Sequence, residues 1–89
     1  FPLRLPAAMA QGENEIVGEV LREFRSRTDL SQEDAAHAAG LHRAQYGRYE
    51  QGRNAVTFVV MLRIAKALGV TIEELAAAVT RRLPKRPKR

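Results

Sequence analysis

Apolar side chains return at helical spacing along most of this chain, and no stretch alternates apolar and polar residues as a strand would. The clearest case runs from Asn14 to Thr28, where apolar residues recur every three or four positions. Glutamates gather near its start and arginines near its end, an order that suits the dipole of a helix. We therefore predict a first helix over this segment.

A second apolar segment, Phe58 to Leu68, is bounded by residues that start and stop helices. Thr57 is a good N-cap, and Gly69 follows the last position, where glycine adopts the left-handed conformation that ends a helix. The segment is apolar nearly all round, so we expect it to be the central, buried helix.

The last predicted helix runs from Ile72 to about Arg82. Thr71 and Glu74 before and within it have the spacing of a capping box, in which the two side chains satisfy backbone N–H groups at the helix start. Pro84 and Pro87 follow and prevent the helix from continuing.

Between Ser31 and Gly52 the sequence predicts two short helices that meet at a sharp corner. Ser31 is an N-cap, and the alanines that follow give the first helix an unusually small surface. Gly40 marks the corner, Leu41 anchors it, and a further helix follows from Arg43 to Gln51. Small residues before a corner let two helices cross closely, which is the helix-turn-helix geometry.

Five helices and no sheet predict an all-α protein with a single core, which a length of 89 residues allows. We expect three parts along the chain. Residues 1–12 are interpreted as a disordered arm or a non-native leader, with Met9 as a candidate natural start. Residues 13–82 form the helical domain, and residues 83–89 form a basic tail.

The formal net charge of +5 is concentrated at the C-terminus. Six of the fifteen basic residues stand in the last nine positions without an acid among them, and the preceding residues hold nine basic and ten acidic side chains. The folded body must therefore bind any polyanion with a local patch, because it has no bulk positive charge. The tail could follow a nucleic-acid backbone, keep the chain soluble or begin a linker.

Several functional classes find no support in the sequence. The chain has no cysteine, so it offers no disulfide, thiolate nucleophile or zinc–cysteine site. His37 and His42 are five positions apart, which is wrong for one helical face, and no nucleophile–base set is recognisable. We expect no enzymatic activity, cofactor or metal. No apolar run reaches membrane-spanning length and no signal peptide appears, so we expect a cytoplasmic protein.

A set of residues at characteristic spacings extends from Val17 to about Leu75. They comprise Gly18, Arg22, Arg25, Leu30 to Glu33, Ala39 to Leu41, Glu50 with Gly52, and Ile64 to Val70. On these residues the chain resembles the phage-repressor and Cro-like, XRE-type family of helix-turn-helix regulators. The resemblance implies a compact five-helix, lambda-repressor-like DNA-binding domain with the helix-turn-helix at helices two and three. The stretch GLHRAQYG, with RN soon after EQG, is also similar to free-standing controller proteins of restriction–modification operons.

The resemblance implies roles for three polar residues. Arg25 and Glu50 would form a structural salt bridge between the first helix and the end of the third. Gln32 would link a phosphate to the recognition helix, and its place at a helix N-terminus suits an anion. The chain departs from the family at Tyr46 and Tyr49, where aliphatic residues are usual, and we expect both rings to pack inward with their oxygens at the rim.

A recognition helix in the major groove presents its N-terminal part and one face. With the two tyrosines turned to the core, the outward face holds the residues that we expect to contact bases: Arg43, Ala44, Gly47 and Arg48. We expect phosphate contacts from Gln32, His42, Gln45, Arg53 and Asn54. Gly47 serves either a close approach to DNA or the packing of helices, and both interpretations stay open.

One recognition helix reads only about half a turn of DNA, so we expect a homodimer on a two-fold symmetric site. Candidate interface residues lie on the fourth and fifth helices: Val59, Val60, Ile72, Leu75 and Val79. Alternatively, the fifth helix merely closes the core.

These features predict a sequence-specific, double-stranded DNA-binding transcription regulator that binds a palindromic operator through its third helix and joins the nucleoid when bound. One alternative is a partner-binding module, such as an antitoxin that autoregulates its operon. Another is the DNA-binding fragment of a longer regulator. The arginines that flank Ala44 and Gly47 favour the regulator, because a pure protein-binding module does not need them.

Overall fold

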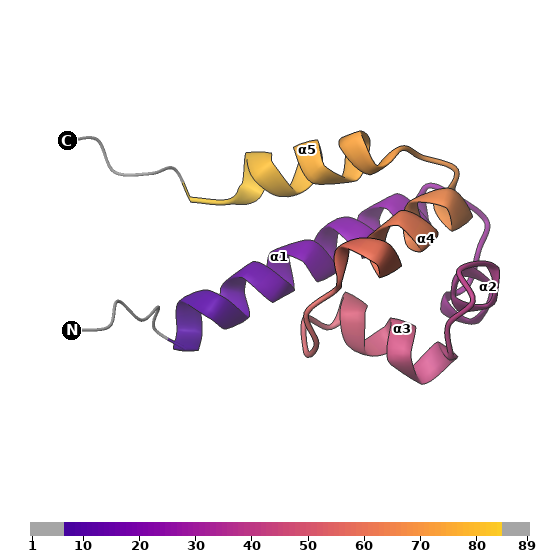
Figure 1. The fold of residues 1–89 in the computed structure, drawn as a ribbon, viewed down its shortest axis with the longest axis horizontal. Coiled ribbons are helices and arrows are strands. Elements are labelled where there is room, and N and C mark those ends of the chain that lie inside the picture. The colour runs from indigo at the N-terminus through magenta and orange to yellow at the C-terminus, as the bar shows by residue number, and fades with distance from the viewer. Residues whose placement is uncertain (1–6, 85–89) are drawn as a thin grey trace.

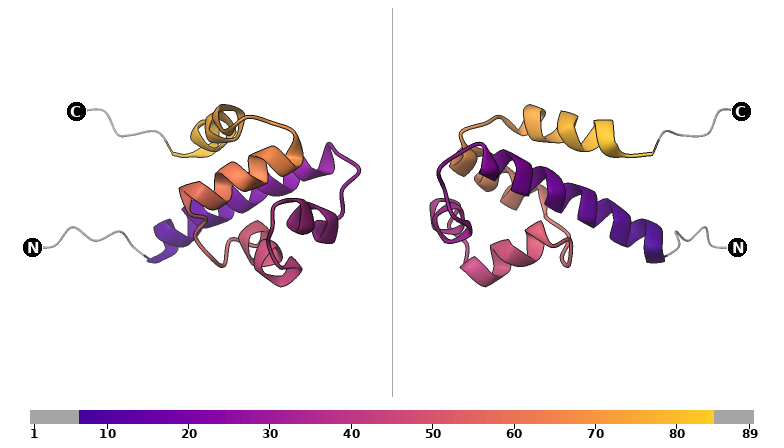
Figure 2. Two further views of the ribbon diagram at one scale, coloured as in Figure 1. Left: turned by 45° about the vertical axis from the view of Figure 1, so that its right-hand side comes forward. Right: turned by 180° about the vertical axis from the view of Figure 1, so that it is seen from behind.

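The computed structural model describes residues 7–84, and within this range it contains five helices and no strand. The helices are α1 (Ala7–Ser26), α2 (Gln32–Ala38), α3 (Arg43–Glu50), α4 (Phe58–Leu68) and α5 (Ile72–Arg82). α1 lies between α5 on one side and α2 and α3 on the other (Figure 1). Figure 2 shows the same order from behind, with α4 on the far side of α1. The predicted all-α fold, with the helix-turn-helix at α2 and α3, is confirmed.

The first helix is longer than predicted. It begins at Ala7 rather than Asn14, so the helix extends into the segment that was interpreted as an arm. Alanine, methionine and glutamine are strong helix formers, so this segment can extend the helix without an apolar period. α1 ends at Ser26, and the chain continues through a hydrogen-bonded turn at residues 27 and 28. Residues 1–6 of the arm and 85–89 of the tail lie outside the described range.

The helix ends form as the sequence predicts. The hydroxyls of Ser31 and Thr57 accept backbone N–H bonds at 3.0 Å and 3.2 Å, which caps α2 and α4. Thr71 and Glu74 form the complete capping box of α5. Gly69, which ends α4, has φ of 74° in the left-handed region. His42 stands at the N-cap position of α3, but its side chain makes no capping bond.

The core is shared by all five helices and is not centred on α4. Val20 and Leu21 of α1 are fully buried, and the buried cluster to which they belong contains side chains from each of the other helices. On α4, by contrast, only the face with Ile64, Ala65 and Leu68 is buried. The other face is exposed, and Phe58 retains 68% of its accessible surface. The prediction of a central α4 is therefore wrong, because an all-round apolar pattern shows only that the helix avoids water, and a partner molecule can cover one of its faces.

Gly18 sets the position of α3 relative to α1. A Cβ at this position would lie 2.4 Å from the carbonyl oxygen of Glu50 and 2.6 Å from that of Tyr49. Only glycine allows the end of α3 to approach the backbone of α1 so closely. This crossing fixes which face of α3 is turned to the core and which to solvent.

Candidate nucleic-acid interface

The inner face of α3 is held by a buried carboxylate. Glu50 is 2% exposed, and its Oε2 accepts a hydrogen bond from Arg25 Nε at 2.7 Å. Its Oε1 accepts from Gln32 Nε2 at 2.8 Å and from Arg25 Nη2 at 3.3 Å. Arg25 also donates to the Leu30 carbonyl oxygen at 3.2 Å. The expected partners Arg25 and Glu50 thus lie together, and Gln32 joins α2 to the same group.

Opposing influences act on the protonation of this carboxylate. Burial alone would raise the pKa of Glu50, but the hydrogen bonds from Arg25 and Gln32 outweigh it and hold the pKa below its ordinary value. The same contact raises the pKa of Arg25. Glu50 is therefore a charged, paired group at neutral pH, and it orients α3 through three elements of the fold.

Of the two tyrosines, Tyr46 differs from the expectation. Both rings pack inward, but Tyr46 has no exposed surface, so its oxygen does not lie at the rim. Its hydroxyl makes no hydrogen bond within residues 7–84. The pKa of Tyr46 is raised mainly by burial and, to a smaller extent, by the nearby Glu50 carboxylate. Tyr49 instead accepts a bond from Gln45 Nε2 at 3.0 Å. Tyr46 therefore cannot offer its hydroxyl to a phosphate, and the Tyr49 hydroxyl is engaged by Gln45.

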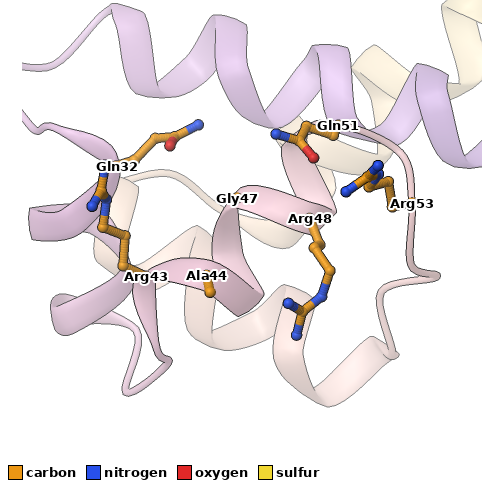
Figure 3. A pocket seen from close by; sticks show the side chains of 7 residues that line it. All are labelled: Gln32, Arg43, Ala44, Gly47, Arg48, Gln51 and Arg53. Atoms are coloured by element: carbon orange, nitrogen blue, oxygen red, sulfur yellow. The ribbon is translucent and has the colours of Figure 1, made fainter.

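The outer face of α3 forms the floor of an open hollow of about 590 Å³. Its lining comprises Gln32, Arg43, Ala44, Gly47, Arg48, Gln51 and Arg53. Figure 3 shows Arg43 and Arg48 on either side of Ala44 and Gly47, with Gln51 and Arg53 beyond Arg48. The four residues predicted to contact bases therefore share one surface. Two long guanidinium groups flank a floor that is almost without side chains.

Packing does not explain the glycine at position 47. A Cβ there would have Gln32 Oε1, at 3.7 Å, as its nearest neighbour, which is ordinary van der Waals contact. The position is partly exposed and its φ lies outside the left-handed region. Of the two interpretations left open, the packing of helices is not supported, since no helix lies close enough to need glycine.

Only some of the residues predicted to contact phosphates lie at the hollow. Gln32 and Arg53 line the hollow, and His42 is exposed just before α3. Gln45 is turned along α3 towards Tyr49 and does not line the hollow.

Gln51 lines the hollow although it was not among the predicted site residues. It follows Ala44, Gly47 and Arg48 at the helical spacing of their outward face, and that spacing could have identified it.

The candidate dimer residues differ in how far they are exposed. Val59 is 59% exposed, whereas Leu75 is fully buried, which removes Leu75 from any interface. Val60, Ile72 and Val79 are partly buried. Phe58 and Leu62 of α4 are also exposed apolar residues, and they were not among these candidates. Beside them lies an apolar groove of about 330 Å³, lined by Val17, Val56, Phe58, Met61, Ile72, Ala76, Val79 and Thr80.

Other kinds of site are not formed within residues 7–84. No three histidine, aspartate or glutamate side chains in this range come together in a way that could hold a metal ion. None of the described helices is long and apolar enough to cross a membrane.

The fold and the basic outer face of α3 define a helix-turn-helix domain. Residues 16–78 match the family described as the helix-turn-helix domain, and the chain belongs to this family of DNA-binding transcription regulators. Over 61 residues it is 38% identical to control protein C.SmaI of Serratia marcescens, covering 68% of this chain and 73% of that protein. It is 39% identical over 59 residues to control protein C.MunI of Mycoplasma, covering 65% and 80%.

Solved structures agree with this assignment. The restriction–modification controller protein C.AhdI of Aeromonas hydrophila superposes with a TM-score of 0.70 at 38% identity, covering 72% of this chain and 97% of that one. The clp gene regulator ClgR of Corynebacterium glutamicum gives 0.75 at 21% identity, covering 80% and 76%, and shows a shared fold. The predicted XRE-type resemblance, and the likeness to controller proteins, are confirmed.

Proposed function

We propose that this helix-turn-helix protein is a sequence-specific regulator of the controller type that binds a palindromic operator as a homodimer, with α3 in the major groove. One observation carries the proposal: α3 is locked from inside by Glu50, while its outer face presents arginines around an open hollow. The relatives are named as control proteins, which supports a regulatory rather than an enzymatic role.

In this proposal the outer face of α3 reads bases. Arg43 and Arg48 each bond to O6 and N7 of a guanine, a contact worth ~1–3 kcal/mol of discrimination against the wrong base. Ala44 contacts a thymine methyl, and Gly47 lets the groove floor approach the helix backbone. Their common position around one hollow supports these roles.

The flanking polar residues fix the orientation on the duplex. Gln32, His42 and Arg53 are placed at the edges of the outer face, where phosphates of a groove-bound duplex would pass. Gln45 can bind a phosphate only if its hydrogen bond to the Tyr49 hydroxyl breaks. Asn54 follows Arg53 in the loop after α3, at the same end of the helix. Such contacts raise affinity for every sequence equally.

The homodimer is assigned to the apolar face of α4. Phe58, Val59 and Leu62 expose large apolar surfaces beside the groove between α1, α4 and α5. Contiguous exposed apolar surface of this kind indicates an interface, and a two-fold operator requires a second copy of the chain. Half-sites ~10 bp apart would then receive the two α3 helices.

The main test is a salt titration of binding to randomised duplexes, with wild type and Arg48→Ala compared. Wild type should select a palindrome, and Arg48→Ala should relax one position in each half-site. If neither protein selects a sequence and affinity falls with salt alone, charge and not α3 drives binding, and the proposal is wrong.

The dimer is tested by sedimentation of Val59→Asp, which places a charge on the exposed face of α4. Ala77→Asp is the matched control, since Ala77 is exposed on α5 and does not line the groove. Only Val59→Asp should shift the protein to monomer. If the wild-type protein is a monomer on its operator, the homodimer proposal is wrong. The exposed face of α4 would then bind a different protein, as the partner-binding alternative requires.

A further inference from the structure

The loop after α3 is held in a fixed shape. Gln51 caps the helix and Gly52 follows in the left-handed region with φ of 74°. Gly52 N donates to the Tyr49 carbonyl oxygen at 3.1 Å, and Arg53 N donates to that of Arg48 at 2.9 Å. These two bonds form a Schellman motif, which reverses the chain at a helix end.

The same loop is fixed against α1. A Cβ at Gly52 would lie 2.7 Å from the Cα of Glu15, so the loop backbone touches the helix backbone directly. Since both the hydrogen bonds and this contact constrain the loop, the residue that follows Arg53 returns to a defined place. That place is beside the side chain of Arg48.

The side-chain amide of Asn54 fits its surroundings in one orientation. With its nitrogen towards the Arg53 carbonyl oxygen it donates at 2.9 Å, and its oxygen then accepts from Arg48 Nε at 3.3 Å. The reverse orientation would place donor against donor and acceptor against acceptor. In this orientation the side-chain oxygen of Asn54 accepts one hydrogen bond from the guanidinium of Arg48.

This contact leaves the recognition end of Arg48 free. A guanidinium has five N–H donors, and the one at Nε is used while those at Nη1 and Nη2 remain for a partner. Two donors in one plane are what guanine O6 and N7 require. At the other end of the hollow, the guanidinium of Arg43 makes no hydrogen bond to residues 7–84. The two arginines thus differ in how far they are ordered before DNA arrives.

We propose that Asn54 is a positioning residue for Arg48, and that it sets the discrimination at the base pair that Arg48 reads. This inference rests on the proposed function and replaces the phosphate contact first expected of Asn54. Ordering a long side chain before binding removes part of the entropic cost of its contact with the correct base. Arg43, without such support, adapts to its base pair and discriminates less strongly.

The test is a double-mutant cycle on operator duplexes that carry single base-pair changes. Wild type should discriminate on the order of 10- to 100-fold at the pair read by Arg48. Asn54→Ala should lower this ratio roughly three- to tenfold and leave the pair read by Arg43 unchanged. In the Arg48→Ala background, Asn54→Ala should change the ratio no further.

Two controls separate positioning from other roles. Gln51→Ala removes a neighbouring side-chain amide that lines the hollow but does not bond to Arg48 Nε, and it should leave this ratio intact. In the free protein, the Nε–H resonance of Arg48 should be protected in wild type and lost in Asn54→Ala. The Nε–H of Arg25, bonded to Glu50 at 2.7 Å, should stay protected in both.

The outcomes are distinguishable. If Asn54→Ala weakens binding to all duplexes equally, Asn54 contacts a phosphate and the positioning role is overturned, while the proposed function stands. If Arg48→Ala relaxes no position of the operator, both the positioning role and the assignment of Arg48 in the proposed function are overturned.

Discussion

The two faces of α3 treat polar groups in opposite ways. On the inner face, Glu50 is buried and each of its oxygens accepts a hydrogen bond from Arg25. On the outer face, Arg43 and Arg48 are exposed around a hollow that the protein leaves open. One helix of eight residues thus separates two tasks. The inner face fixes its position in the fold, and the outer face keeps donors available for a partner.

This separation makes the two faces independently testable. A buried charge without its partners is costly, so changes on the inner face should act on stability. Changes on an exposed face usually alter stability by within ~0.5 kcal/mol, so those on the outer face should act on recognition. The changes below run from the largest expected effect on this division to the smallest.

Glu50→Ala should have the largest effect. It leaves Arg25 and Gln32 without their common acceptor in a part-buried site, and breaking such a pair typically costs ~3–5 kcal/mol of the free energy of unfolding. Thermal melting should show the loss, and DNA binding should fall as a consequence. Arg48→Ala is the control and should melt close to wild type. An unchanged melting temperature for Glu50→Ala would contradict the structural role.

Gly18→Ala should come next. Its Cβ would fall 2.4 Å from the Glu50 carbonyl oxygen, and the backbone of α3 must move to accept it. Overpacking costs about 1–3 kcal/mol or more against unfolding, and here it also shifts the outer face relative to the rest of the domain. Chemical denaturation measures the cost.

The matched control for that change is Gly12→Ala on the same helix, where a Cβ meets nothing within 4 Å. It should be neutral or stabilise by up to about 1 kcal/mol, because alanine favours a helix more than glycine does. Equal effects of the two substitutions would show that the close crossing of α1 and α3 is not needed.

Lowering the pH should reduce the free energy of unfolding by less than Glu50→Ala or Gly18→Ala does, through protonation of Glu50. The pKa of Glu50 is lowered in the fold, so its contribution to stability is present above the ordinary pKa of glutamate and is lost as pH falls through the folded pKa. Denaturation midpoints followed downwards from about pH 5 should fall more steeply for wild type than for Glu50→Gln, which cannot titrate.

Glu23→Gln provides the comparison for that acid series. The pKa of Glu23 is also lowered, chiefly by Arg82 of α5 and then by Arg27, but the group is at the surface, where solvent screens its pairs. Its removal should change the slope with pH less than the removal of Glu50. The reverse order would place the main acid-sensitive contact on the surface and not beneath α3.

The sequence predicted the framework well because its signals are local. Caps such as Thr71 with Glu74, and the left-handed Gly69, depend only on neighbours in the chain. The outward face of α3 followed from a period of 3.6 residues. Two expectations failed because they depend on distant contacts: that the Tyr46 oxygen lies at the rim, and that α4 is buried on all sides.

Gly47→Ala is the smallest and most discriminating change. Alanine should stabilise α3 by roughly 0.5–1 kcal/mol, because it favours a helix and its Cβ would make only ordinary contact with Gln32 Oε1 at 3.7 Å. The same methyl group would stand on the floor of the hollow, between the two arginines. We therefore expect a higher melting temperature together with weaker binding to the operator. Ala44→Gly, on the same floor, should lower the melting temperature instead. If Gly47→Ala raised stability and bound DNA as tightly as wild type, the groove would not approach α3 closely here, and Gly47 would have no part in recognition.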